Sequence, residues 1–157
     1  MMPSRPNHRE SEQGDSGKNS KSEARNPKQI RITKIQMTKT GNSKQYDLED
    51  RTLAFAKRVR AFVKQLRKTI ANIEDGKQLI KASGSVGANY IEANEAISKK
   101  DFILRIKICR KEAKESRYWL RLVDTNDDKE LGGERKELEQ EATELTNIFG
   151  SILRKSD

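Results

Sequence analysis

The sequence predicts an all-α fold: an antiparallel, up-down-up-down four-helix bundle with a disordered N-terminal tail. Charged residues make up 36% of the 157 positions and aromatic residues 5%, which favours amphipathic helices over a sheet sandwich. Between 99 and 123, small or apolar residues recur at alternating spacings of four and three, which draws one stripe along a long helix. The members of that stripe are Phe102, Ile106, Cys109, Ala113, Ser116, Leu120 and Val123.

The tail is predicted over residues 1–44. This segment is rich in Ser, Asn, Lys and Arg, contains all three prolines and has almost nothing to bury. It holds ten Lys or Arg against four acidic residues, so most of the net charge of +9 lies there. We therefore expect a disordered basic extension over 1–44 and a folded domain over 45–157.

The first helix is predicted over 47–67, because the Asp47 carboxylate can cap the free amides of the first turn. Its apolar stripe is Thr52, Phe55, Val59, Phe62 and Leu66. The second helix is predicted over 72–97, with the stripe Leu79, Ala82, Val86, Tyr90, Ala93 and Ile97.

The third helix is predicted over 99–123, since Ser98 and Asp101 have capping-box spacing. The segment 124–133 then indicates a break, and the fourth helix is predicted over 134–154 with the stripe Leu138, Ala142, Leu145, Phe149 and Ile152. Short connections make sequential helices antiparallel, which completes the predicted bundle.

No residue set for catalysis or metal binding is evident. A di-metal site in such a bundle needs histidines on the helices, and the single histidine of the chain is His8, in the tail. Cys109 falls on an apolar stripe, which is typical of a core residue, and Lys129 replaces the glycine that a calcium loop starting at Asp124 requires. We expect a non-enzymatic protein without a cofactor.

Small residues gather at 82–88 (ASGSVGA), where glycines in a helix interior indicate close approach of a second helix, within the protomer or between protomers. Nearby polar residues predict a structural hydrogen-bond network that fixes helix register. Its candidate members are Gln78, Ser85, Asn89, Glu92, Glu112 and Glu115.

Two basic helix faces predict contact with a polyanion. The candidate nucleic-acid-binding residues are Lys57, Arg60, Lys64 and Arg67 on the first helix and Arg105, Lys107, Arg110, Lys111, Lys114, Arg117 and Arg121 on the third. The competing interpretation is that glutamates of the fourth helix neutralise these cations: Glu134, Glu137, Glu139, Glu141 and Glu144. Tyr118 and Trp119 adjoin the second group and could stack on unpaired bases or pack locally.

Two function classes follow. The first is an oligomer that binds structured nucleic acid, with RNA favoured, through phosphates. The second is an adaptor that docks another protein, such as a nucleic-acid enzyme. No apolar run approaches the roughly 20 residues of a membrane span, and the N-terminus lacks the apolar core of a signal peptide, so we expect a cytoplasmic protein without a membrane partner.

The segments QLIKASGSVGANYIEANEA (78–96) and SKKDFILRIKICRKEAKESRYWLRL (98–122) closely resemble the four-helix-bundle proteins encoded in intervening sequences of bacterial 23S rRNA genes, the S23 ribosomal protein family. The likeness spans about 46–153. By motif, Gln78, Ser85, Asn89 and Glu92 match the signature of the family's second helix, and Arg105, Arg110 and Glu115 match that of its third.

The resemblance implies a ring-shaped homo-oligomer, a homopentamer. The chain is also similar to the accessory protein of diversity-generating retroelements, which implies binding of nucleic acid and of a reverse transcriptase. Where the family has Ala-Glu-Gly, this chain has Ile91, Glu92 and Ala93, so we expect the second helix to continue through this point.

Overall fold

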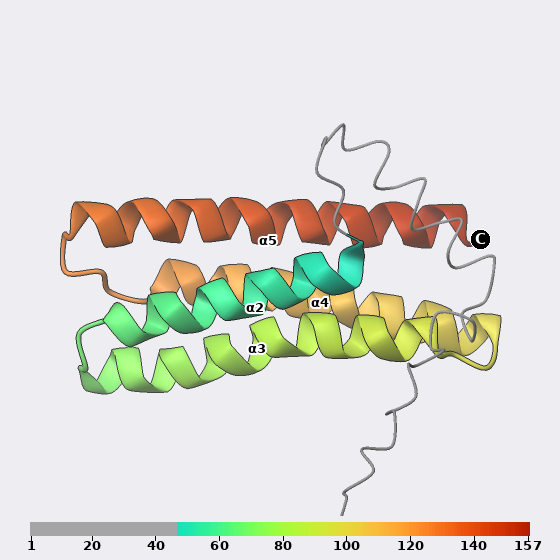
Figure 1. Cartoon of the computed structure of the whole chain (residues 1–157), viewed down its shortest axis with the longest axis horizontal. Coiled ribbons are helices and arrows are strands. Elements are labelled where there is room, and N and C mark those ends of the chain that lie inside the picture. Colours follow the sequence, from blue (N-terminus) through green and yellow to red (C-terminus); the bar gives the residue numbers. More distant parts are fainter. Residues whose placement is uncertain (1–46) are drawn as a thin grey trace, which may run out of the picture.

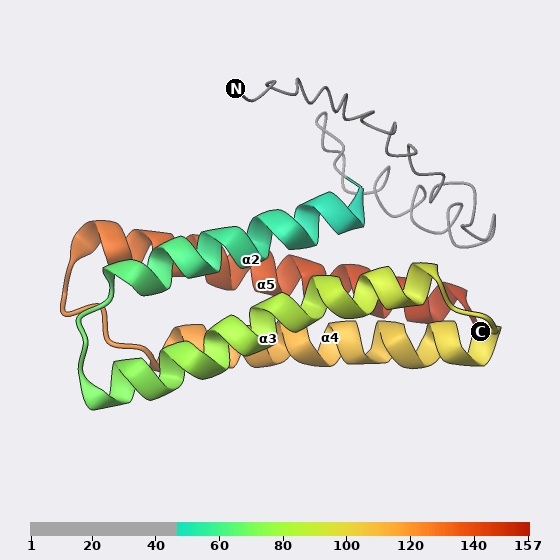
Figure 2. The same cartoon turned by 60° about the horizontal axis from the view of Figure 1, so that its bottom comes forward.

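A computed structural model describes residues 47–157, and the extension predicted over 1–44 lies outside them. Within the described residues the chain forms α2 (Leu48–Gln65), α3 (Ile70–Asn94), α4 (Lys99–Leu122) and α5 (Lys129–Lys155). The helices alternate in direction and pack as a bundle (Figures 1 and 2), which confirms the predicted all-α fold. α2 and α4 each pack against both α3 and α5, so α2 and α4 occupy diagonal positions.

An oxygen-bearing side chain caps the start of every helix in 47–157. The Asp47 carboxylate accepts hydrogen bonds from the amides of Glu49 (2.6 Å) and Asp50 (3.1 Å), and the Ser98 hydroxyl accepts one from Asp101 (3.0 Å). Both predicted caps are therefore confirmed. Thr69 and Asp128 cap α3 and α5 in the same way, which satisfies amides that have no partner inside the helix.

The second helix ends at Asn94, before the predicted end at Ile97, whose side chain is 96% exposed rather than buried. Ser98 adopts extended backbone to cap α4, so residues 95–97 must leave the helix and reverse the chain. The expectation that α3 continues through Ala93 is confirmed.

The fourth helix begins at Lys129, five residues before the predicted start at 134. Asn126 and Asp127 adopt left-handed backbone (φ 55° for each) and make the turn that places Asp128 as the cap. Leu131 is buried in the first turn. Its burial offsets the cost of about 1 kcal/mol for each of the two helical glycines that follow it.

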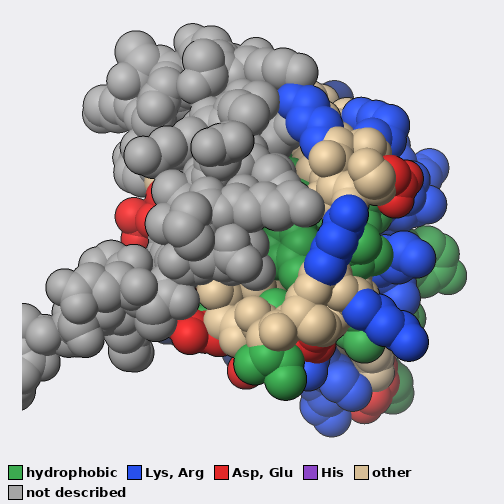
Figure 3. All heavy atoms as spheres, turned by 90° about the vertical axis from the view of Figure 1, so that its right-hand side faces the viewer, with side chains coloured by type: hydrophobic (Ala, Val, Ile, Leu, Met, Phe, Trp, Pro, Cys, Tyr) green, Lys and Arg blue, Asp and Glu red, His purple; other side chains and the backbone are tan. Residues whose placement is uncertain are grey.

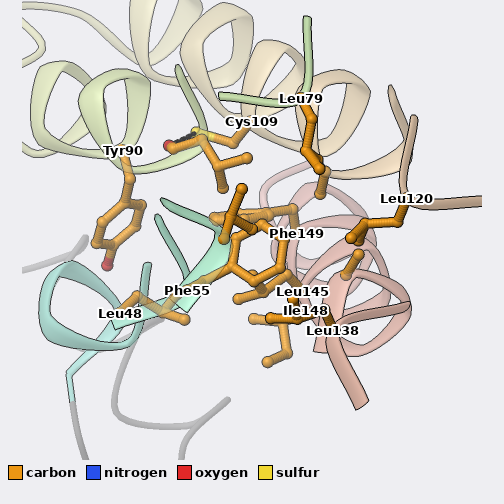
Figure 4. Packing of buried hydrophobic residues seen from close by; sticks show 14 of the residues in the cluster. Leu48, Phe55, Leu79, Tyr90, Cys109, Leu120, Leu138, Leu145, Ile148 and Phe149 are labelled. Atoms are coloured by element: carbon orange, nitrogen blue, oxygen red, sulfur yellow. Dashed lines mark hydrogen bonds between the residues drawn. The ribbon is translucent and has the colours of Figure 1, made fainter. Parts of the chain in front are cut away.

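The core lies between the four helices and contains the predicted stripes without Ile97, together with Leu48, Leu131 and Ile148. Figure 4 shows side chains from all four helices converging there, with the rings of Tyr90 and Phe149 5.9 Å apart. Within 47–157, no helix is both long and apolar enough to cross a membrane.

The glycines of α3 face α2 inside the protomer. A Cβ at Gly87 would lie 2.9 Å from Thr52 Oγ1, and one at Gly76 would lie 3.2 Å from Val63 Cγ1. The contact predicted for 82–88 is therefore an intramolecular one at Gly87, where no side chain fits between the two helices.

Candidate nucleic-acid interface

The outward face of α4 carries a continuous row of cations, here called the α4 ridge. The buried stripe of α4, from Phe102 to Leu120, fixes the rotation of the helix and leaves the opposite side in solvent. The exposed cations on that side are Lys107, Arg110, Lys111, Lys114, Arg117 and Arg121. In the end-on view, Lys and Arg side chains gather along one edge of the molecule (Figure 3).

Few carboxylates approach the α4 ridge. Lys111 lies 3.7 Å from its neighbour Glu112, and Arg121 lies 4.0 Å from Glu139 of α5. Exposed pairs of this kind are worth at most about 1 kcal/mol. The other four ridge cations have no carboxylate within 4.0 Å among residues 47–157: Lys107, Arg110, Lys114 and Arg117.

The ridge borders two shallow hollows that share Lys107. The first, of about 400 Å³, is lined by Lys107, Arg110, Lys111 and Lys114 of α4 and by Leu153 of α5. The second, of about 760 Å³, extends towards the start of α4 and adds Lys99, Lys100, Ile103 and Leu104 among its lining residues. A concave surface lined by several cations suits an extended anion with several charges better than it suits a small ion with a single charge.

Arg105 was predicted with this group but lies apart from it. Its Nη1 donates to Asn89 Oδ1 of α3 (3.2 Å), and its Nε lies 3.9 Å from Asp101. The side chain is only 37% exposed and connects α3 to α4, so it contributes less free charge than the ridge residues.

The predicted cations of α2 form a second, separate face. Lys57, Arg60, Lys64 and Arg67 are exposed, and Arg60 and Arg67 donate to neutral oxygens, Ala56 O (3.2 Å) and Asn126 Oδ1 (3.4 Å). Because α2 lies diagonally across the bundle from α4, the fold does not bring the two predicted groups together.

The glutamates of α5 neutralise a third set of cations. Arg51 donates to both Glu141 oxygens (2.9 and 2.8 Å) and to Glu144 (3.1 Å). This pairing with Glu141 is the main cause that raises the pKa of Arg51. Arg58 lies 3.1 Å from both Glu134 and Glu137.

The competing interpretation names glutamates that do neutralise cations, but their partners Arg51 and Arg58 are not among the candidate binding residues, because one edge of α5 faces α2. It does not extend to the four unpaired ridge cations, since Glu139 alone among the five glutamates approaches α4, at Arg121.

The six predicted network residues do not meet in one cluster. Asn89 bonds to Arg105 and to Ser85 O, whereas the Ser85 hydroxyl donates to Lys81 O of its own helix. Glu115 accepts from Trp119 Nε1 (3.4 Å), and Gln78 and Glu92 are exposed. Glu112 contacts Lys111, and burial, followed by the nearby charge of Glu115, raises its pKa.

A different buried polar residue joins two connections. The Asn72 side chain donates to Arg67 O (3.0 Å) and Asp124 O (2.9 Å) and accepts from the Asp124 amide (2.9 Å). Sequence reasoning missed it because the pairing spans 52 positions. The sequence signal that could have drawn attention to Asn72 is its position three residues after the Thr69 cap.

Tyr118 is 56% exposed beside Lys114 and Arg121, and its ring meets that of Trp119 edge-on, with centroids 5.1 Å apart. Trp119 is partly buried and bonded to Glu115. One face of the tyrosine therefore remains open next to the cations.

Cys109 belongs to the core, as predicted. Its thiol donates to Val86 O (3.4 Å), and burial raises its pKa to about 12. A thiol with this pKa stays protonated at neutral pH and is a poor nucleophile.

Comparison with known proteins agrees with the four-helix fold. The family described as 23S rRNA-intervening sequence protein matches residues 44–151. A crystal structure at 1.70 Å resolution, of a protein with unknown function from the S23 ribosomal protein family of Bacteroides thetaiotaomicron, is 30% identical, with a TM-score of 0.57. The match covers 68% of this chain and 97% of that one. A search of curated proteins finds no match.

Proposed function

The chain belongs to the 23S rRNA-intervening sequence protein family, and from this premise we propose that it is a non-enzymatic oligomer that binds structured nucleic acid, with RNA favoured, through phosphate contacts. The observation that carries the proposal is the α4 ridge, where four cations have no carboxylate within 4.0 Å among residues 47–157. Such cations bind a phosphate backbone without first giving up an ion pair.

The two basic faces have unequal parts in this proposal. Both sets of cations line a hollow. Four cations and Leu153 line the hollow on α4, whereas the hollow of about 470 Å³ between α2 and α3 mixes Arg60, Lys64 and Arg67 with apolar side chains such as Ile73 and Ile80. The α4 ridge is therefore the principal contact. A weaker contact on another side of the protomer comes from Lys57, Arg60 and Lys64 of α2 and from Arg67, which lies beyond the end of α2 at Gln65.

Self-association, as the homopentamer that the resemblance implies, would present several α4 ridges to one ligand. Exposed apolar side chains on three helices support association: Leu53 of α2, Ile73 and Ile91 of α3, and Leu104 and Leu122 of α4. Exposed apolar surface of this kind is typical of protein contacts.

A single purification tests both parts of the proposal, self-association and nucleic-acid binding. A pentamer has five times the 18.0 kDa mass of the chain by light scattering, and bound nucleic acid raises the absorbance ratio of 260 to 280 nm until salt removes it. A stoichiometric protein that copurifies in place of nucleic acid would instead favour the adaptor class.

Filter retention then tests the surface. Changing Arg110, Lys114, Arg117 and Arg121 together to Glu is expected to abolish RNA retention at physiological ionic strength, with measurable binding only at lower salt, while leaving the helical circular dichroism signal intact. Unchanged retention by this folded variant would refute the proposal.

A further inference from the structure

Two arginine side chains approach each other where the α4 ridge meets the last turns of α5. Gly150 is buried on α5, and the position that a Cβ would occupy there lies 3.5 Å from Arg154 Nη1 and 3.8 Å from Arg110 Nε. Two guanidinium groups from different helices therefore converge on one point.

Neither guanidinium has a counter-ion among the described residues. No carboxylate of 47–157 lies within 4.0 Å of Arg110 or Arg154, although α5 carries many glutamates. Two like charges held this close repel each other, and an anion between them would remove that repulsion.

The residues around Arg110 add positive charge and a concave surface. Arg110 also lines the hollow of about 400 Å³, together with Lys107, Lys111 and Lys114, and Leu153 forms its apolar side. The glycine matters because, without a side chain, it lets both guanidinium groups lie close to the α5 backbone.

We infer that Arg110 and Arg154, held together at Gly150, form a phosphate seat, with Lys107 and Lys114 at its edge. A guanidinium is a planar fork of donors that suits phosphate oxygens, and one phosphate between two such forks accepts from both. The inference rests on the proposed function, since a backbone phosphate of a nucleic acid is the ligand, and it adds Arg154 and one defined contact point to the α4 ridge.

Fluorescence anisotropy with a labelled RNA hairpin tests the seat on the full chain. Arg110→Gln and Arg154→Gln are each expected to weaken binding about tenfold, the usual effect of losing a charged hydrogen bond. The matched control is Arg58→Gln, which removes the same charge from an arginine already bound to Glu134 and Glu137. The control is expected to change the Kd less than about threefold, because it reduces only the overall electrostatic attraction between the protein and RNA.

The double variant decides whether the two arginines act together. If both hold one phosphate, Arg110→Gln/Arg154→Gln weakens binding by clearly less than the product of the single effects. Independent multiplication, or single effects no larger than that of Arg58→Gln, would overturn the seat and leave the proposed function intact.

A second probe keeps the seat testable if the protein binds no RNA. Inorganic phosphate is titrated while the NMR signals of the Arg Nε–H groups are followed. Saturable shifts of the Arg110 and Arg154 signals, lost for Arg110 in Arg154→Gln, would support a seat for free phosphate and refute the RNA proposal. Unshifted signals in a protein that also binds no RNA would refute both.

Discussion

Asn72 and Asp124, 52 positions apart, exchange two hydrogen bonds of 2.9 Å: the Asn72 amide nitrogen donates to Asp124 O, and the Asp124 backbone nitrogen donates to Asn72 Oδ1. A third bond from the same side chain reaches Arg67 O. One buried side chain thus joins the α2–α3 connection to the segment that follows α4.

Replacing Asn72 with alanine is expected to lower the free energy of unfolding by about 2–4 kcal/mol, because three backbone groups lose their partner at a buried site. Chemical denaturation followed by circular dichroism measures the change. Asn147→Ala on the exposed side of α5 is the control, where the gain in helix propensity leaves stability equal or raised by up to about 0.7 kcal/mol. Equal effects of the two substitutions would show that the Asn72 bonds contribute nothing.

Gly87 and Gly133 are both helical glycines but differ in their surroundings. Gly87→Ala is expected to destabilise the bundle by about 1–3 kcal/mol, because the new Cβ would lie 2.9 Å from Thr52 Oγ1. Gly133→Ala meets no atom within 4 Å and is expected to stabilise by up to about 1 kcal/mol. Thermal unfolding of the two variants compares them, and a stabilising Gly87→Ala would rule out the close α2–α3 contact.

The Cys109 thiol makes stability depend on alkaline pH. Burial raises its pKa from 9.0 to about 12, so the folded state holds the proton more tightly than the unfolded state. Its contribution is complete below pH 9 and is lost as pH rises towards 12, at about 1.4 kcal/mol per pH unit in that window.

Denaturation at several pH values from 8 to 11 measures this slope. Lys and Tyr also titrate there, so the relevant quantity is the difference between the wild type and Cys109→Ala. That difference is expected to shrink as pH rises. A difference that is constant across the range would mean that the thiol ionises equally in both states.

The helices and their buried faces were predictable from the sequence because both follow from local spacing and capping. The start of α5 was not, since burial of Leu131 outweighed two glycines, and that burial depends on the assembled bundle. The cations of the candidate site were identifiable individually. Their neutralisation was not, because Glu134, Glu137, Glu141 and Glu144 share one edge of α5, and the hand of the bundle decides whether that edge faces α2 or α4.

Contacts between residues that lie far apart in the sequence could not be predicted from the sequence either. Arg110 and Arg154 meet at Gly150 through α4–α5 packing, and no periodicity within either helix indicates that meeting. The same holds for Asn72 and Asp124.

The salt dependence of RNA binding tests the central claim most directly. Each phosphate contact contributes about 0.9 to the slope of log affinity against log salt on a duplex, so reversing Arg110, Lys114, Arg117 and Arg121 to Glu is expected to reduce the slope by about 3.6. The control reverses Lys77, Lys81, Lys129 and Lys136, exposed lysines of α3 and α5, for the same change in net charge. A much shallower slope for the α4 ridge variant and a nearly unchanged one for the control is the predicted result, and equal slopes for the two variants would contradict it.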